Sequence, residues 1–423
     1  MTYSENENLD YEKLFKLSCK FISEDNYDDS IKTSLELLKI IPKKFIHKVH
    51  YNLGFCYKHK FDFKRAEEHF LKSNIVQDYV YAKKGLFELY CYIGDWFSGY
   101  RYFDWNFARI DLFHYDYETS KKKRLDWEDP NVQLPISLRF NKSIPKISEK
   151  WSDLSYKNFY ERCLNKIEGK ILHIFCSQGL GDVIQCSYFL NDLLKYNPKK
   201  IILSVRSELL RVMCGITNDP RLVIFNKFIN PQEYDYFIPS FSLIKLFKYN
   251  PKNLKESWIN VLHRDKFYFN DRLKQLIKEI HGDQIQNKKI IGINWRGNPK
   301  HPLDHKRSMT LEKILNLNDY SDQILASFQF NPTLEEKKLF KKYKIVDLSH
   351  MIHDVYDMSC FLSNVSHLHS VDSAPIHLAG AMGIESTCYL VKVYEDPRWG
   401  FEGNKKIYKS VKIRRLEYQQ ISS

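Results

Sequence analysis

Two patterns of hydrophobic and polar residues divide the chain. Up to residue 114, the sequence is repetitive and typical of paired helices. After Gly169, short apolar runs alternate with longer amphipathic stretches, which is typical of parallel sheets with crossover helices. Between these parts, residues 115–166 are irregular and include the basic run 121–124. We therefore expect helical repeats over 1–114, a connector over 115–166 and an α/β region from residue 167.

The helical part contains one clear repeat and two weaker ones. In the clear copy, Leu53-Gly54, Tyr57, Ala66 and Phe70 stand at the offsets of a tetratricopeptide repeat, which these segments resemble. Gly54 and Ala66 would let two antiparallel helices approach, while the larger side chains fill the space between them. The weaker copies are marked by Leu17, Phe21, Ser30, Leu37 and Pro42 upstream, and by Gly94-Asp95, Tyr100, Phe103 and Trp105 downstream. Such repeats would either recruit an acceptor or partner protein, or support the catalytic domain as a cap.

The α/β region contains two series of predicted strands. The first series is 171–176, 200–205, 221–226 and 235–239, and a basic helical stretch over 271–280 follows it. The second series is 289–295, 323–329, 344–349, 367–372 and 386–391. We expect two Rossmann-like lobes, 167–285 on the acceptor side and 286–423 on the donor side, in a GT-B architecture with a cleft between them. Ligands of such sheets bind beyond the carboxyl ends of the strands.

Composition and charge say more about the partners and the cellular compartment of the protein than about its reaction. A net charge of +13 favours anionic partners, although scattered lysines are more simply a solvated surface. No RNA-binding signature occurs, so we expect no nucleic-acid partner. The nine cysteines form no CxxC pair, which argues for a reducing compartment and against structural zinc. The polar N-terminus is unlike a secretory signal, and no apolar stretch is long enough to span a bilayer. We expect a cytoplasmic protein, free or peripheral at the inner membrane surface.

The first candidate motif is CSQGLGDVIQ at residues 176–185, where a strand turns into a helix. Gly179 and Gly181 permit a tight turn and close approach by a ligand. Asp182 would sit at the helix N-terminus, where the helix dipole keeps a carboxylate ionised. The competing role for Asp182 is a simple helix cap. A dinucleotide fingerprint fits poorly, because Ile184 occupies the third glycine position and no acid follows the second strand.

The second candidate motif is a basic loop after the strand predicted at 289–295. A helix is expected from Ser308 or Thr310, so several cations would lie beside a helix N-terminus at the carboxyl end of a strand. That combination suits a diphosphate, although any single lysine in it is by default a solvated residue. The cations are Arg296, Lys300, His301, His305, Lys306 and Arg307.

The third candidate motif is HSVDSAPIHLAGAMG at residues 369–383. A strand ends at Asp372, Ser373-Ala374 follows, and Pro375 suits the first turn of a helix. The amides over 373–376 would point toward a phosphate beyond the strand end. His377 on the first turn could also reach a ligand, although a lone helical histidine is more often structural.

In this order behind a repeat domain, GLGDVIQ, NWRGNPKH with DHKRS, and SVDSAPIHLAGAMG resemble bacterial tetratricopeptide-repeat glycosyltransferases. Their catalytic half is similar to the ADP-heptose heptosyltransferases of glycosyltransferase family 9. The resemblance covers nearly the whole chain and implies a GT-B fold and an inverting, metal-independent transfer without a cofactor. It implies a nucleotide-diphospho-sugar donor and makes Asp182 the general base. The candidate donor-binding residues are Gly179, Gly181, Gln185, Asn298, Lys306, Arg307, Ser308, Asp372, Ser373, Ala374 and His377.

Two departures from the family pattern bear on the donor. Ser373-Ala374 stands where heptosyltransferases often have Thr-Gly, and Trp295-Arg296-Gly297 replaces the usual WSG. No DxD triplet occurs in the chain, in keeping with a site in which cationic side chains take the place of a metal ion.

Other functions stay open at this point. An O-linked protein glycosyltransferase would bind its protein acceptor in the repeats, and an inactive scaffold would retain the fold without the reaction. A NAD-dependent oxidoreductase is disfavoured by the missing third glycine and ribose-binding acid. The sugar, the nucleotide base and the acceptor, whether glycan or protein, are not specified by these motifs.

Overall fold

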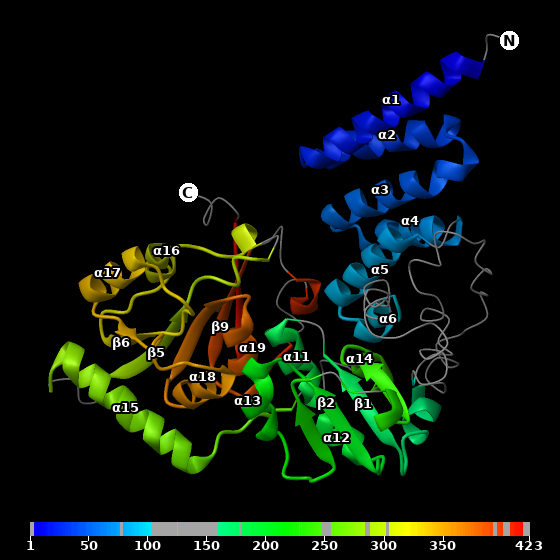
Figure 1. Ribbon diagram of the computed structural model, residues 1–423. Helices are drawn as coiled ribbons and strands as arrows, with labels where there is room; N and C mark the ends of the chain where they lie inside the picture. The colour runs from blue at the N-terminus through cyan, green and yellow to red at the C-terminus, as the bar shows by residue number, and fades with distance from the viewer. Residues whose placement is uncertain are drawn as a thin grey trace. The chain divides into compact units, whose positions relative to one another are not determined.

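The computed structural model describes residues 4–76, 79–102, 125, 160–176, 179–227, 229, 231–247, 255–283, 288–301, 304–391, 396–400 and 407–417 (Figure 1). The chain forms two compact units. The first contains the helices before residue 103, and the second contains the α/β elements from Tyr160 onward together with Leu125.

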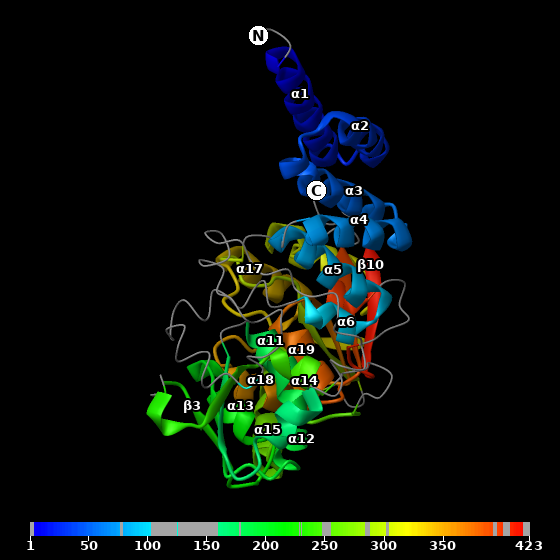
Figure 2. The same ribbon diagram turned by 90° about the vertical axis from the view of Figure 1, so that its right-hand side faces the viewer.

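The first unit is a run of antiparallel helices that stack in chain order (Figures 1 and 2). Asn26 caps the second helix, because its side chain accepts from the Asp29 amide, and Gly94 ends the fifth with a left-handed φ of 75°. The helices are α1 (Ser4–Ser23), α2 (Tyr27–Ile40), α3 (Ile46–His59), α4 (Phe63–Val76), α5 (Val80–Ile93) and α6 (Trp96–Arg101), with the short η1 (Lys43–Phe45) between α2 and α3. The three predicted helical pairs are therefore present. Phe103 and Trp105 of the third lie outside the described residues.

Close approach between these helices depends on glycines that face one aromatic ring. Phe70 of α4 is fully buried, and a Cβ built on Gly54 of α3 would lie 2.6 Å from its ring. A Cβ on Gly85 of α5 would lie 2.5 Å from the tip of the same ring. Ala66 is also fully buried, as its spacing predicts. Leu17, which belongs to the upstream copy, is by contrast 40% exposed.

The second unit contains two parallel sheets, and the sheet with the helices that follow its strands is here called a lobe. The first lobe has the strand order β3-β2-β1-β4. Its elements are β1 (Ile171–Phe175), α11 (Leu180–Cys186), η3 (Ser187–Phe189), α12 (Leu190–Leu194), β2 (Lys200–Ser204), η4 (Ser207–Leu209), α13 (Leu210–Cys214), β3 (Leu222–Phe225), η5 (Pro231–Glu233), β4 (Tyr236–Pro239) and α14 (Ser242–Leu246).

The second lobe follows the long helix α15 (His263–His281) and has the strand order β10-β9-β8-β5-β6-β7. The order reverses between β5 and β8, so the residues after these two strands lie at the switch point where such sheets bind ligands. Its elements are β5 (Lys289–Asn294), η7 (Asp304–Lys306), α16 (Leu311–Asn316), β6 (Gln323–Ser327), α17 (Leu334–Tyr343), β7 (Val346–Asp347), α18 (Val355–Leu362), β8 (His367–Val371), α19 (Ala374–Ala381), β9 (Ser386–Val391), η8 (Pro397–Trp399) and β10 (Val411–Leu416).

All nine predicted strands are present, and the structure adds a tenth. The predicted strand over 344–349 shrinks to the two residues of β7, and the helix predicted over 271–280 extends to α15. The tenth strand, β10, has charged residues interspersed among apolar ones in VKIRRL and pairs with β9 at the edge of its sheet. An edge strand with charged side chains lacks the continuous apolar run by which the interior strands were recognised.

The two lobes contact each other through several elements. Helix α11 packs on α19, and the Trp258 amide donates to the carbonyl of Ala381 at the end of α19. A second contact between the lobes is made by Arg211 of α13, which forms ion pairs with Asp354 and Asp357 at the start of α18, at 3.0 and 2.9 Å. Through the first of these contacts, helices α11 and α19 lie side by side.

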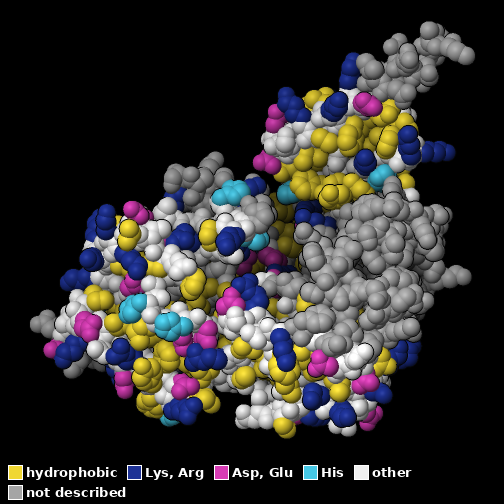
Figure 3. All heavy atoms as spheres, in the orientation of Figure 1, with side chains coloured by type: hydrophobic (Ala, Val, Ile, Leu, Met, Phe, Trp, Pro, Cys, Tyr) yellow, Lys and Arg dark blue, Asp and Glu magenta, His cyan; other side chains and the backbone are white. Residues whose placement is uncertain are grey.

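On the one face that Figure 3 shows, the positive charge is distributed as expected for a solvated surface. On the face shown in Figure 3, lysines and arginines are scattered among acidic side chains and form no single basic patch over the described residues. Among those residues, no helix has the length and apolar character that crossing a bilayer requires.

Candidate functional site

The glycine-rich turn after β1 places Asp182 on the first turn of α11. Gly179 is the N-cap residue, and its amide donates to Asp182 Oδ2 at 3.1 Å. The predicted capping role of Asp182 is therefore real, but it uses one oxygen only. The side chain is 24% exposed, so the carboxylate is partly accessible.

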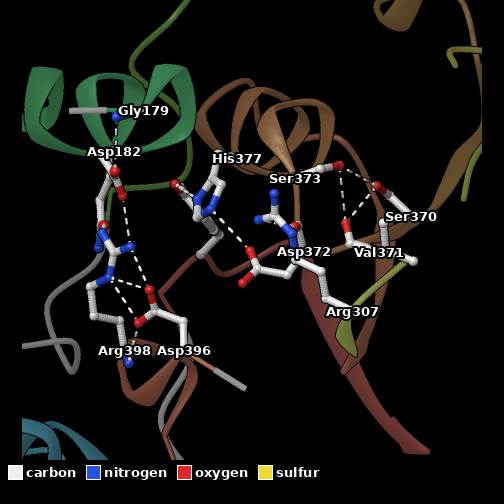
Figure 4. A network of polar contacts seen from close by, with 12 residues as sticks. Gly179, Asp182, Arg307, Ser370, Val371, Asp372, Ser373, His377, Asp396 and Arg398 are labelled. Atoms are coloured by element: carbon white, nitrogen blue, oxygen red, sulfur yellow. Dashed lines mark hydrogen bonds and ion pairs between the residues drawn. The ribbon is translucent and has the colours of Figure 1, made fainter. Parts of the chain in front are cut away.

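The second oxygen of Asp182 is bound by an arginine from the other lobe. Arg398 Nη2 donates to Asp182 Oδ1 at 2.7 Å, and Nη1 donates to Gln185 Oε1 at 2.8 Å (Figure 4). The same guanidinium forms a fork with Asp396, through Nε to Oδ1 at 2.9 Å and Nη2 to Oδ2 at 2.6 Å. It also lies over the ring of Phe241, 5.2 Å from the centroid.

Direct contact between α11 and α19 brings the first and third motifs together. A Cβ built on Gly181 would lie 3.0 Å from His377 Cγ and nearer still to Cδ2. Glycine is therefore required at position 181 for helix packing, whatever its role toward a ligand. His377 and Gly181 are both buried.

Both ring nitrogens of His377 have partners. Nε2 lies 3.3 Å from Asp372 Oδ1, Nδ1 lies 2.8 Å from the Tyr408 hydroxyl, and Trp399 packs beside the ring at 5.3 Å between centroids. Burial alone would raise the pKa of Asp372, but the hydrogen bond with His377 and the charges of His377, Arg307 and Arg398 bring that pKa below its usual value. Asp372 is thus held as a carboxylate, and His377 orients it.

The end of β8 is tied to the end of β5 by a small polar network. Asn294 is paired in register with Ser370, and its Oδ1 accepts from Ser370 at 3.1 Å and from Ser373 at 2.7 Å. The side chain of Ser373 therefore points into this network. Ala374 begins α19 directly after it.

The expected row of free amides over 373–376 is shorter than predicted. Pro375 has no N–H, and the Ile376 amide already donates to the Ser373 carbonyl at 3.1 Å. The amides of Ser373 and Ala374 are the two that this strand end could present to a phosphate.

The basic loop after β5 brings one cation to this network. Arg307 Nη1 donates to the Asp372 carbonyl at 2.9 Å, and its Nε donates to Asp304 Oδ1 at 3.0 Å. Ser308 closes the loop, because its hydroxyl accepts from the Gly297 amide and donates to Asp304, both at 2.9 Å. A Cβ on Gly297 would lie 2.5 Å from Arg307 Nη2, so this glycine makes room for the guanidinium.

The other cations of the loop are placed differently. Arg296 donates from Nε and Nη2 to Glu336 of α17, at 2.9 and 2.7 Å, so its charge is neutralised away from Arg307. Burial alone would raise the pKa of Glu336, but its hydrogen bonds, above all with Arg296, lower it. Asn298 is exposed and accepts from the Lys300 amide within its own turn, and Lys306 is half-buried at the end of η7.

Arg398 is the residue of this site that the three motifs did not reveal. Figure 4 shows six of the predicted residues close together, and these are Gly179, Asp182, Arg307, Asp372, Ser373 and His377. Gly181 joins them through its contact with His377, and Gln185 joins them through Arg398. Arg398 lies far from Asp182 in sequence, in EDPRWG, and nothing local marks its partner. The tripeptide Asp-Pro-Arg was the available signal, because its first residue can hold the arginine in a defined direction.

No protein-family model matches this chain, and no curated protein matches it in sequence. Among solved structures, the chain is similar to a glycosyl transferase family 9 protein from Veillonella parvula DSM 2008, with 14% identity and a TM-score of 0.44 over 59% of this chain and 87% of that one. It is also similar to the E. coli ADP-heptose LPS heptosyltransferase II, with 11% identity and a TM-score of 0.41 over 58% of this chain and 90% of that one. The wall teichoic acid polymerase TagF gives 11% identity and a TM-score of 0.24, over 63% of this chain and 82% of that one. Likeness at this level says nothing about the reaction or its substrates.

Proposed function

We propose that this protein is an inverting, metal-independent glycosyltransferase that moves a sugar from a nucleotide-diphospho-sugar to a hydroxyl of a glycan or protein acceptor. The observation that carries the proposal is the meeting of the two lobes at α11 and α19. There Asp182, at a helix N-terminus, stands beside the strand-end group of Asp372 and His377 with Arg307. In this proposal, the three motifs that resemble the glycosyltransferases are parts of one site.

Asp182 is the proposed general base. It would take the proton of the acceptor hydroxyl as the oxygen attacks the anomeric carbon, and the nucleoside diphosphate would leave. Each carboxylate oxygen of Asp182 has a second lone pair beyond the bond to Gly179 or Arg398. The 24% exposure of the side chain supports access to an acceptor.

The departing diphosphate would be stabilised at the switch point of the second sheet. Arg307 and the amides of Ser373 and Ala374 lie at the ends of β5 and β8, where donors of this kind are worth about 3–4 kcal/mol each when well placed. In this proposal, Asp372 fixes the site through its contacts with His377 and Arg307. Asn298 and Lys306 would contact the donor from the segment between β5 and α16.

An inactive scaffold is the second candidate, and one observation favours it. Both carboxylate oxygens of Asp182 already accept hydrogen bonds, so an acceptor hydroxyl would have to share one of them. A scaffold of this kind would bind a nucleotide or nothing at all, and it would transfer no sugar.

A donor screen separates these candidates. Purified protein is titrated calorimetrically with ADP, GDP, UDP and TDP, and then incubated with the matching nucleotide sugars, with and without EDTA, while nucleoside diphosphate release is followed. We expect one nucleotide to bind and its sugar donor to be consumed equally well in EDTA. Nucleotide binding without turnover would favour the scaffold. If no nucleotide binds, the proposal is wrong, and loss of turnover in EDTA would overturn its metal-independent form.

A further inference from the structure

We propose that Arg398 is the positioning residue for Asp182, holding its carboxylate in one orientation from across the lobe contact. This inference rests on the proposed function, because it concerns the group that acts as the base there. Arg398 comes from η8 of the second lobe, yet it contacts Asp182, Gln185 and Phe241 of the first.

The chain contains a second copy of the tripeptide that builds this arrangement. Asp219-Pro220-Arg221 precedes β3, and Asp396-Pro397-Arg398 forms η8. In both copies the arginine forks onto the aspartate two residues earlier. Nη2 lies 2.6 Å from Oδ2 in each copy, and Nε lies 3.0 Å from Oδ1 of Asp219 and 2.9 Å from Oδ1 of Asp396. The fork itself is therefore a local structure of the Asp-Pro-Arg sequence.

The two copies differ in what the outer nitrogens of the arginine meet. Arg221 is 32% exposed, and its Nη1 reaches the side-chain oxygen of Asn197 at 3.2 Å. Arg398 is 11% exposed, and its outer nitrogens meet Asp182 at 2.7 Å and Gln185 at 2.8 Å. The same local fork thus lies at a more exposed position in the Arg221 copy and against the candidate base in the Arg398 copy.

The geometry specifies a role in orientation rather than in neutralising charge alone. The fork with Asp396 fixes the plane of the guanidinium, and Gln185 fixes its rotation from the other side. Arg398 then binds Oδ1 of Asp182 while the Gly179 amide binds Oδ2, so the carboxylate plane is fixed at both oxygens. A lysine at position 398 would keep the positive charge but could not make this set of bonds at once.

Arg398→Lys tests the inference, with Arg221→Lys as its matched control. Both variants are compared with the wild type for affinity toward ADP, GDP, UDP and TDP, and for release of nucleoside diphosphate at saturating donor sugar. We expect Arg398→Lys to lower turnover about ten- to hundredfold, as misplacement of a catalytic group does. Affinity for the diphosphate should stay within about twofold, because Arg398 acts through Asp182. Arg221→Lys should change neither quantity.

A double variant shows whether Arg398 acts through Asp182. In the Asp182→Asn background, adding Arg398→Lys should lower the remaining turnover by no more than about twofold, because the group that it positions is already lost. Multiplied losses would overturn the inference. So would unchanged turnover in Arg398→Lys, or a weakened diphosphate affinity with full turnover at saturation, which would make Arg398 a phosphate ligand.

Asp396→Asn keeps the test decisive if the lysine variant does not fold, since Asp182 and Asp396 are two partly buried carboxylates that share this cation. This variant retains Arg398 and loosens only its fork, and Asp219→Asn is its control. Lower turnover in Asp396→Asn alone supports the inference, and equal turnover in both contradicts it. A wild type that binds no nucleotide and consumes no donor would instead refute the proposed function, before any variant is made.

Discussion

Gly181 of α11 lies directly against the imidazole of His377 of α19, so closely that a Cβ on Gly181 would stand 3.0 Å from His377 Cγ and nearer to Cδ2. One residue belongs to the first lobe and the other to the second. Their contact brings the helix that carries Asp182 against the helix that follows Asp372. The positions of the candidate base and the candidate donor site therefore depend on the absence of a Cβ atom at Gly181.

Gly181→Ala should separate these helices. The added methyl group has no space beside a histidine whose two nitrogens are held by Asp372 and Tyr408, so we expect a loss of about 1–3 kcal/mol in the free energy of unfolding and a clear fall in turnover. Urea unfolding of the full chain measures the first effect. Gly179→Ala is the comparison, because its Cβ would meet only Asp182 Oδ2 at 3.3 Å. Equal stability of the two variants would show that the contact is not tight.

Gly54→Ala should destabilise the helical unit in the same way. A Cβ at Gly54 would lie 2.6 Å from the ring of Phe70, which is fully buried, so we expect a cost of about 1–3 kcal/mol, measured by the loss of helical circular dichroism in urea. Phe70→Leu in addition should return part of this energy, because the shorter side chain vacates the space. If the two changes are simply additive, the ring is not what opposes the methyl group.

Acid should loosen helices α3 and α4. Burial lowers the pKa of His59 and of His69 to about 4, and it lowers the pKa of His50 as well, so these side chains are neutral in the folded state. Below the usual histidine pKa of about 6.5, the unfolded chain binds more protons than the folded one. Their contribution to stability is therefore full above pH 6.5 and is lost as the pH falls toward about 4.

Hydrogen exchange checks this pH dependence in the full chain. We expect the protection of α3 and α4, corrected for intrinsic exchange, to fall between pH 7.5 and pH 5, because these histidines bind protons more readily when the helices are unfolded. His69→Gln should reduce that fall, whereas His350→Gln, at an exposed position, should not. A pH-independent protection in the wild type would mean that these histidines are not neutral when folded.

Arg307→Ala should weaken nucleoside diphosphate binding. A charge-assisted hydrogen bond contributes about 1.5–3 kcal/mol, so we expect the dissociation constant to rise about ten- to hundredfold. Arg296→Ala is the informative comparison, since Arg296 lies in the same loop but is bound to Glu336. It should change stability and leave nucleotide affinity nearly unaltered. The reverse result would place the phosphate site beside Arg296 instead.

The parts of the fold that were predictable share a physical origin. Interior parallel strands are rich in consecutive apolar residues, so β1, β2 and β5 could be predicted from the order of residues along the chain. The edge strand β10 was not, because Lys412, Arg414 and Arg415 interrupt its apolar residues. Gly54 was predicted as a close-approach residue, but its partner ring is shared with Gly85, and this is a tertiary fact that spacing does not contain.

The candidate site shows the same limit. Glycine turns and strand-end motifs are local, so Asp182, Arg307 and Asp372 could be found in the sequence. What each side chain contacts is not local: Arg296 turns to Glu336, Ser373 to Asn294, and Arg398 to Asp182. The partner that directs each of these three side chains comes from another element of the fold.

Asp182→Asn, compared with the wild type, tests the central claim most directly. Nucleoside diphosphate affinity and consumption of the donor sugar that the screen identifies are measured on both proteins. The amide keeps the size of the side chain but cannot take a proton, so we expect transfer to fall to a small residual rate while nucleotide affinity stays nearly intact. Full transfer by Asp182→Asn would contradict the account, because the reaction would then need no base at this position.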